Sequence, residues 1–252
     1  MTKKLKILTA VLTGVAALAS SAIAQEAVVM VEEEVAPVSL SVGVDIASAY
    51  VFRGATRNDG IVVQPWLDAT TSFGLNFGIW ANFDIGDYDG TLEENEFSEM
   101  DIYIGWGTTV ADMIDLGVEY CEYTYPNGGD SDREISINTG IPAGPIGLGV
   151  AAYFGVGGEI EKTIYLEATA EYDIDITEEL SAAIAGSAGY LIDDNDGGKN
   201  GFQDYSIGAS LAYRIFGASV TYIGQGDDKV IPEKQYGYDV EVVGMLSVGY
   251  DF

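Results

Sequence analysis

The chain has 252 residues, of which 40 are acidic, 11 are basic and none is histidine, and its formal net charge is −29. Because phosphate binding needs clustered Lys and Arg, this composition excludes nucleic acid as a partner. Without histidine, Ser-His triads and most zinc catalysis are also excluded, and we expect no enzyme, no cofactor and no metal site.

Residues 1–24 predict an export signal. Three lysines precede an apolar run over residues 7–19, and Ala22 and Ala24 form the small-x-small pattern of a cleavage site. The apolar run is shorter than the roughly 20 residues that a spanning helix needs. Cleavage removes three lysines and no acids, so 8 basic residues remain against 40 acidic ones, a formal charge of −32. Residues 25–37 contain an acidic run and a proline, and predict a flexible periplasmic lead-in.

From Val38 onward, apolar residues alternate with small or polar ones at the period of two that a strand requires. In the first segment Val44 and Ile46 point one way, and Gly43 and Asp45 point the other. The predicted strands are residues 38–53, 61–71, 75–85, 99–107, 114–123, 134–141, 146–155, 163–174, 180–191, 204–215, 218–223 and 236–252. Only helices and closed barrels satisfy all backbone hydrogen bonds inside a bilayer, and no residue run here could form a spanning helix. Residues 38–252 therefore predict an all-β fold, a single antiparallel up-and-down transmembrane β-barrel of about 12 strands.

The connections between these strands alternate in length. Long polar segments follow the odd-numbered strands, and short ones follow the even-numbered strands, from residues 72–74 to residues 216–217. Outer-membrane barrels have short periplasmic turns and longer outer loops. The pattern predicts a barrel in the cell outer membrane with both termini in the periplasm. Pro65 cannot donate to a strand ladder, so we expect it at the outer rim or in a bulge.

The last segment, residues 240–252, carries aromatic residues on its apolar face and ends on phenylalanine. This segment closely resembles the last strand of outer-membrane barrels, whose assembly machinery recognises a final strand that ends in Phe. We expect the barrel-assembly machinery, outer-membrane lipid and lipopolysaccharide as partners. The predicted assembly signal comprises Leu246, Val248, Tyr250 and Phe252.

One motif carries a family resemblance. Ala49-Tyr50-Val51-Phe52-Arg53-Gly54, followed by Asn58-Asp59-Gly60 and Val63-Gln64-Pro65, resembles the TorF-family porins, also called Gcw_chp proteins. The match covers mainly residues 40–85. In that family a glycine often follows the glutamine, whereas Pro65 and Trp66 stand here. The resemblance implies a barrel at the cell surface and a pore, and it implies no catalytic residue.

Arg53 and Gln64 fall on the lumen faces of consecutive predicted strands, so the two side chains could meet near the rim. Two interpretations follow: a structural clamp, in which Arg53 anchors neighbouring acids, or a solute-binding role.

Many carboxylates fall on the predicted lumen faces, with few cations among them. So many ionised carboxylates could not share a dry interior, and twelve strands enclose more space than side chains fill. We therefore predict a hydrated lumen with negative potential that favours small cations. The predicted lining residues are Asp45, Arg53, Gln64, Asp68, Trp80, Asp84, Asp101, Glu119, Glu134, Glu167, Glu171, Asp204, Arg214 and Glu241.

Three other features indicate little chemistry. Cys121 is the only cysteine, so the chain has no internal disulfide, and a buried or lumenal thiol is expected. The acidic loop from Asp193 to Asp204 matches a calcium-binding loop poorly, which indicates at most weak, adventitious cation binding. Acidic pairs occur by chance in so acidic a chain and do not indicate a hydrolase.

Two functions remain open from the sequence. The first is a porin-like channel for passive diffusion of small solutes, with a preference for cations. The alternative is a non-conducting structural or surface-interaction barrel, because aromatic residues such as Trp66, Trp80, Tyr103 and Tyr153 could fill the lumen.

Overall fold

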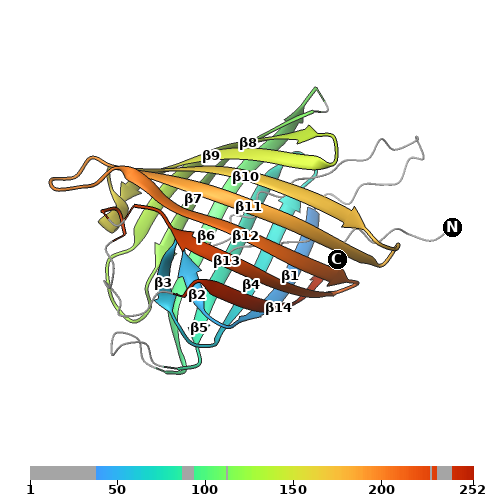
Figure 1. Ribbon diagram of the computed structural model, residues 1–252, viewed down its shortest axis with the longest axis horizontal. Coiled ribbons are helices and arrows are strands. Elements are labelled where there is room, and N and C mark those ends of the chain that lie inside the picture. Colours follow the sequence, from blue (N-terminus) through green and yellow to red (C-terminus); the bar gives the residue numbers. More distant parts are fainter. Residues whose placement is uncertain (1–37, 87–93, 112, 228, 232–239) are drawn as a thin grey trace.

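The computed structural model describes residues 38–86, 94–111, 113–227, 229–231 and 240–252, and these form a closed barrel (Figure 1). Each barrel strand pairs antiparallel with its neighbours, and the last strand pairs with the first. The predicted single up-and-down barrel of twelve strands is confirmed. The predicted export signal and lead-in lie outside the described residues. The barrel strands are β1 (Val38–Ala47), β4 (Val62–Thr71), β5 (Leu75–Asp84), β6 (Glu96–Val110), β7 (Ile114–Thr124), β8 (Asp132–Ala143), β9 (Ile146–Gly157), β10 (Thr163–Asp175), β11 (Leu180–Asp193), β12 (Gly201–Tyr213), β13 (Phe216–Gln225) and β14 (Val242–Asp251).

The two faces of the sheet differ as the alternation predicts. Outward-facing residues such as Ile104, Ile137 and Leu211 are about half exposed, at 49%, 56% and 52%. Inward-facing carboxylates such as Asp101 and Glu134 are buried. Large apolar side chains spread over an outer wall mark a surface that hydrocarbon covers, so this is a transmembrane barrel. Among the described residues, no helix is long and apolar enough to cross a membrane.

The two ends of the barrel carry different connections. One end, here called the turn end, carries the short links at residues 72–74, 111–113, 144–145, 176–179 and 214–215. The other end, the loop end, carries the longer links (Figure 1). The predicted alternation of long and short connections is confirmed. The chain finishes at the turn end, where the Phe252 amide donates to the Leu40 carbonyl across 2.8 Å.

The prediction of a single strand over residues 38–53 is wrong for residues 48–53. The strand ends at Ala47, and the chain then enters a two-stranded hairpin, β2 (Tyr50–Phe52) and β3 (Ala55–Asn58), which pairs only with itself. At the break, the Ser48 amide donates to the Gly244 carbonyl (2.9 Å), and the Ser48 hydroxyl accepts from the Gly244 amide (3.0 Å). Alternation continues past Ser48 because the hairpin also has two faces, so periodicity alone does not reveal the break.

The hairpin turns on Arg53 and Gly54, which both have positive φ, at 46° and 78°. Two residues with positive φ are what a type I′ hairpin turn needs, and its twist matches that of the flanking strands. At Gly54 a Cβ would lie 2.6 Å from the Cβ of Asp204 on the barrel wall. Glycine at this position therefore allows both the turn and its close approach to the wall.

The base of the hairpin is packed into the barrel by apolar side chains. Tyr50 and Val51 are 2% and 1% exposed, and they belong to a buried cluster with Val62, Trp80 and Val243. The Tyr50 and Trp80 rings lie 5.5 Å apart. Tyr50 has the same parity as Val44 and Ile46 in the predicted strand of residues 38–53, yet it lies inside the barrel.

Pro65 lies inside β4, near its start at the loop end. The β4–β5 ladder pairs Val63 with Phe83 and next pairs Trp66 with Trp80, in the same register. Beside the proline, the Gln64 side chain donates to Asn82 (3.0 Å). Pro65 thus lies near the rim, as predicted, and β4 accommodates it without a bulge.

Candidate functional site

The hairpin β2–β3, called the inner hairpin from here on, crosses the lumen near the loop end. It leaves the barrel between β1 and β4, and its tip reaches β8, β9 and β10 on the opposite side of the strand order. Side chains from β5, β6, β12 and β13 contact its two flanks. The candidate functional site is therefore a constriction built by the inner hairpin and the wall around it.

Arg53 at the tip forms the central contact. Its two terminal nitrogens donate to the Glu134 carboxylate of β8 at 2.8 and 2.9 Å. The guanidinium also lies over the rings of Tyr153 and Tyr165, with centroids at 4.5 and 4.3 Å. The Tyr123 hydroxyl donates to the same carboxylate at 3.0 Å. Since Arg53 is 8% exposed and Glu134 2%, this is a buried ion pair with satisfied carboxylate oxygens, the geometry that offsets desolvation best.

Two wall amides hold the carbonyls of the turn. Gln203 of β12 donates to the Arg53 carbonyl at 2.8 Å, and Gln225 of β13 donates to the Gly54 carbonyl at 3.1 Å. These bonds satisfy backbone groups that would otherwise be unpaired inside the barrel.

The opposite flank is held by carboxylates of β5 and β6. The Tyr50 hydroxyl donates to Glu99 at 2.9 Å, and the Asn58 amide donates to Asp84 at 2.6 Å. The inner hairpin is thus fixed by side-chain contacts on both flanks and at its tip, and by no strand ladder with the wall.

Two predictions about lumen cations are wrong. Arg53 does not lie on the first barrel strand and does not meet Gln64. It turns away from that wall and reaches Glu134, because the chain leaves the sheet after Ala47. Arg214 lies in the turn between β12 and β13, with its side chain 56% exposed, where it pairs with Glu179 at 2.9 Å. There, the hydrogen bond from Arg214 lowers the pKa of the Glu179 carboxyl below its ordinary value of 4.5.

Most other predicted lining residues lie on the inner wall. Asp84, Asp101, Glu134 and Asp204 are buried around the inner hairpin, as are Gln64 and Trp80. Inward-facing residues with partial exposure are Asp45, Asp68, Glu119, Glu167 and Glu171. Glu241 lies just before β14 at the loop end and is exposed. The residues of the predicted assembly signal lie on β14 and at its end, with outward and exposed side chains.

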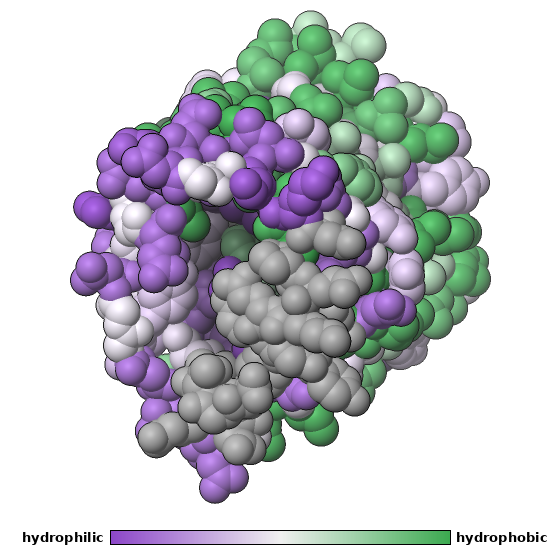
Figure 2. Space-filling view, turned by 60° about the vertical axis from the view of Figure 1, so that its left-hand side comes forward, coloured by the Kyte–Doolittle hydropathy of each residue, from purple (hydrophilic) through white to green (hydrophobic). Residues whose placement is uncertain are grey.

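The lumen widens away from the hairpin. Along β10, the inward-facing residues pass from Tyr165, 1% exposed, through half-buried Glu167 to exposed Thr169. The half of the lumen nearer the turn end is therefore open to water along this wall. Figure 2 looks obliquely toward the loop end and shows hydrophilic residues around a hollow, with hydrophobic residues over the outer side.

Some buried oxygens of the inner wall have no hydrogen-bond partner. They include one carboxylate oxygen each of Asp84, Asp101 and Glu119. Anionic oxygens that protein donors leave unsatisfied attract water or a cation. The inner wall around the constriction is thus rich in carboxyl groups, against which the inner hairpin sets Arg53 and Arg57.

Sequence reasoning did not single out several residues of the constriction. Glu99 shares the inward face of β6 with Asp101, so strand alternation alone could have placed it. Nothing in the local sequence assigns Gln203 and Gln225 to the hairpin, because the chain separates them from it by 150 and 171 residues.

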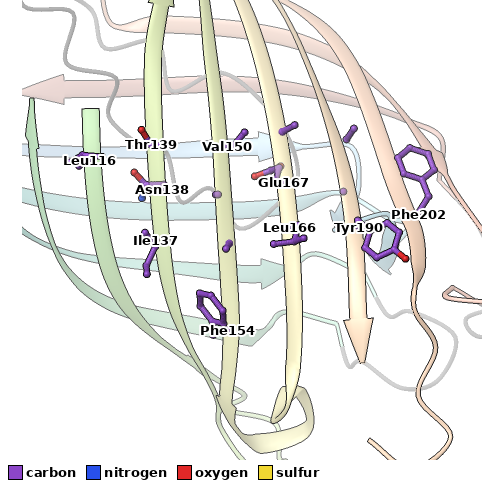
Figure 3. Close-up of a pocket in the computed structure, with 15 residues that line it drawn as sticks. Leu116, Ile137, Asn138, Thr139, Val150, Phe154, Leu166, Glu167, Tyr190 and Phe202 are labelled. Carbon is purple, nitrogen blue, oxygen red and sulfur yellow. The ribbon is translucent and has the colours of Figure 1, made fainter. Parts of the chain in front are cut away.

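A cavity of about 760 Å³ lies over β7 to β12 on the outer wall (Figure 3). Its large apolar lining residues, such as Ile137, Val150 and Leu166, have the outward phase of their strands and are 40–56% exposed, whereas Asn138 and Glu167, which also line it, have the inward phase. This concavity belongs to the lipid-facing surface and not to the lumen. Among the described residues, no group of three or more Cys, Asp or Glu is arranged to hold a metal ion.

Comparison with known proteins gives a family and a fold. The sequence model of a family described as "Bacterial protein of unknown function (Gcw_chp)" matches residues 32–247, well beyond residues 40–85. No curated protein matches the chain significantly.

Among solved structures, the chain resembles the KdgM porin at 6% identity and a TM-score of 0.52, covering 85% of this chain and 99% of that one. For a KdgM porin in complex with disordered oligogalacturonate, the identity is 6% and the TM-score 0.50, with 85% of this chain and 98% of that one covered. For the NanC porin, the identity is 11% and the TM-score 0.47, with 83% of this chain and 97% of that one covered. At these identities, the likeness to KdgM shows a porin-type barrel fold alone.

Proposed function

The chain belongs to the Gcw_chp family, whose function is unknown, and from the barrel it forms we propose that it is a porin-like channel of the outer membrane. The proposed activity is passive diffusion of small solutes, with a preference for cations. The proposed path runs through the open, acidic half of the lumen and past the inner hairpin.

One observation carries the proposal: the inner wall combines carboxylates with water access. Glu119 and Glu171 are partly exposed on the inner wall, and Thr169, two positions before Glu171 on β10, is exposed. Inner-wall carboxylates that remain charged lower the energy of a cation in the lumen and raise that of an anion.

The charge also distinguishes this lumen from one suited to acidic sugars. One KdgM structure contains oligogalacturonate, a polyanion. A chain with a net charge of −29 and inward-facing acids repels such a ligand. We therefore propose cations and small neutral solutes as the permeating class.

For orientation, we propose that the turn end faces the periplasm and that the loop end faces outward, as the short turns of such barrels suggest. The termini would then be periplasmic. Lipopolysaccharide and lipid would surround the wall, and the assembly machinery would recognise β14 and Phe252.

Recording from the purified protein in planar bilayers under a KCl gradient tests the channel and its selectivity. We expect a reversal potential near the K⁺ equilibrium potential, and a reversal potential closer to zero in the double variant Glu119→Gln/Glu171→Gln. The double variant keeps the shapes of both side chains and removes both carboxyl groups. Anion-selective currents, or none from correctly folded protein, would contradict the proposal.

The alternative, a non-conducting structural barrel, is favoured by one specific observation, which is that the inner hairpin spans the lumen. Liposome swelling distinguishes the two functions, because a barrel sealed at the constriction excludes even the smallest sugars. A swelling rate equal to that of protein-free liposomes would favour the sealed barrel.

A further inference from the structure

The side chain of Arg53 occupies a pocket with the chemistry of an organic-cation site. The pocket, called the cation box from here on, consists of Glu134, Tyr123, Tyr153 and Tyr165. Glu134 binds the guanidinium at two points, and the rings of Tyr153 and Tyr165 lie 4.5 and 4.3 Å from the guanidinium carbon. Aromatic faces within about 6 Å of a cation attract it through the ring quadrupole, and a carboxylate adds a directional ionic bond.

The cation box is built by the barrel wall and not by the inner hairpin. Tyr153 and Tyr165 face each other directly across the β9–β10 ladder, with their ring centroids 5.9 Å apart. Glu134 faces Cys121 across the β7–β8 ladder, two positions from the pair of Tyr123 and Asp132. Strand ladders fix all four positions, with a register shift in the β8–β9 ladder between Arg133 and Glu134, so we expect the box to keep its shape when Arg53 leaves.

The group that fills the box is held by side-chain contacts and not by a strand ladder with the wall. The inner hairpin forms its own two-stranded sheet, and such a hairpin is marginally stable by itself. Its tip residue holds a positive φ of 46°, a conformation that costs energy for any residue other than glycine. In addition, the Arg53 Nε has no hydrogen-bond partner in the box. Arg53 therefore resembles a tethered ligand in a rigid site.

We propose that the cation box is a binding site for organic cations with a guanidinium or alkylammonium group, and that Arg53 occupies it when no solute is bound. A solute cation that takes the box displaces the tip of the inner hairpin and opens the constriction. The role of this site in transport rests on the proposed channel function, whereas the binding of organic cations to the cation box does not.

Competition with the tether sets the expected affinities. A group on a short tether acts at an effective concentration on the order of millimolar, so a free cation must compete with Arg53 in the wild type. Removing the Arg53 side chain abolishes that competition. An added guanidinium compound should thus bind the Arg53→Ala variant about tenfold or more tightly than the wild type.

Thermal unfolding in detergent with increasing ethylguanidinium chloride tests the site without any transport. In Arg53→Ala, we expect the unfolding temperature to rise with ethylguanidinium and saturate, while sodium chloride at equal ionic strength gives no such rise. In Arg53→Ala/Glu134→Gln, which lacks the box carboxylate, the rise should be lost. Arg214→Ala serves as the control, because it removes an exposed Arg–Glu pair at the turn end and leaves the cation box unchanged.

Cys121 provides a second readout on the native chain. It is 3% exposed, and Phe52 of the inner hairpin packs against its cluster. Displacement of the tip should uncover it, so ethylguanidinium should speed its reaction with a water-soluble thiol reagent in the wild type, and equal sodium chloride should not. Should Arg53→Ala fail to assemble alone, refolding it with ethylguanidinium should restore the barrel.

No saturable effect of ethylguanidinium on Arg53→Ala, or an equal effect on Arg214→Ala, would overturn the site. An unchanged Cys121 reaction rate in the wild type would overturn the displacement of the hairpin. Binding without any bilayer conductance would leave the site standing and would count against the channel alone.

Discussion

At the scale of residues, the ion pair between Arg53 and Glu134 is the contact on which the constriction depends. The two residues are 81 positions apart in sequence, and both are buried. Their attraction offsets the desolvation of both charges only while they stay together, so each depends on its partner.

Replacing Arg53 with alanine should therefore destabilise the barrel by about 3–5 kcal/mol, because Glu134 would remain buried without its cation. In Arg53→Ala/Glu134→Gln the loss should be smaller, since no charge is left unpaired. Denaturant unfolding in detergent micelles measures both. An unfolding free energy of Arg53→Ala equal to that of the wild type would show that the pair does not hold the hairpin.

The exposed pair of Arg214 and Glu179 predicts a pH effect. The hydrogen bond from Arg214 lowers the pKa of Glu179 in the folded state, so the pair stabilises the fold at neutral pH. This contribution is lost as the pH falls through the lowered pKa, which lies below 4.5. The difference in unfolding temperature between wild type and Glu179→Gln should thus be small at pH 7 and should shrink on acidification, as the pH falls through the lowered pKa. A difference in unfolding temperature that grew on acidification would contradict the stabilising role of this pair.

Residue chemistry could be predicted from the sequence only where it follows from strand alternation. The period of two assigns Asp84, Asp101 and Glu134 to the inner wall, and the structure has them there. It assigns Arg53 to the wall as well, where the structure does not have it. Which residue pairs with which across a lumen depends on the path of the chain in three dimensions, and the local pattern does not contain it.

At the scale of elements, every barrel strand could be predicted, and the inner hairpin could not. Membrane strands follow the period of two closely because lipid covers one face and the lumen the other. Ser48 interrupts the alternation where β1 ends, yet the residues after it resume the pattern. Tyr50 and Val51 are both buried, in one cluster with residues of β4, β5, β13 and β14, because the hairpin lies inside the barrel.

Removing the inner hairpin should leave the barrel intact. It shares no ladder with the wall, so replacing residues 49–60 with a short Gly-Ser linker removes side-chain contacts and no barrel strand. We expect the variant to keep its β-sheet circular dichroism and its heat-modifiable migration on gels, with a lower unfolding temperature. Loss of all folded barrel would show that the hairpin is needed for assembly and not only for constriction.

The terminal strand makes a separate prediction. Phe252 lies 72% exposed, its ring 4.9 Å from that of Tyr250, and its backbone joins Leu40. Since its side chain adds little to packing, Phe252→Ala should refold normally in detergent but assemble poorly in cells if the residue is an assembly signal. Comparing folded yields in the two settings measures this, with Leu211→Ala as a control on the same outer wall. Equal folded yields of Phe252→Ala and the wild type in cells would contradict the role of Phe252 as an assembly signal.

At the scale of the whole molecule, the barrel combines a wide enclosure with an internal obstruction. Twelve strands enclose a lumen wider than side chains alone would fill, and the inner hairpin occupies part of it near the loop end. The remaining lumen is acidic and opens to water toward the turn end. A channel of this design conducts ions to the extent that the constriction leaves or makes a passage.

Single-channel recording of the wild type beside the variant without the inner hairpin tests the proposal that the hairpin obstructs a cation-conducting lumen. We expect small, cation-selective steps from the wild type and several-fold larger steps, still cation-selective, from the variant, because the wall carboxylates remain after the obstruction is removed. Two correctly folded proteins with the same conductance, or a hairpin-free barrel that passes no current, would contradict it.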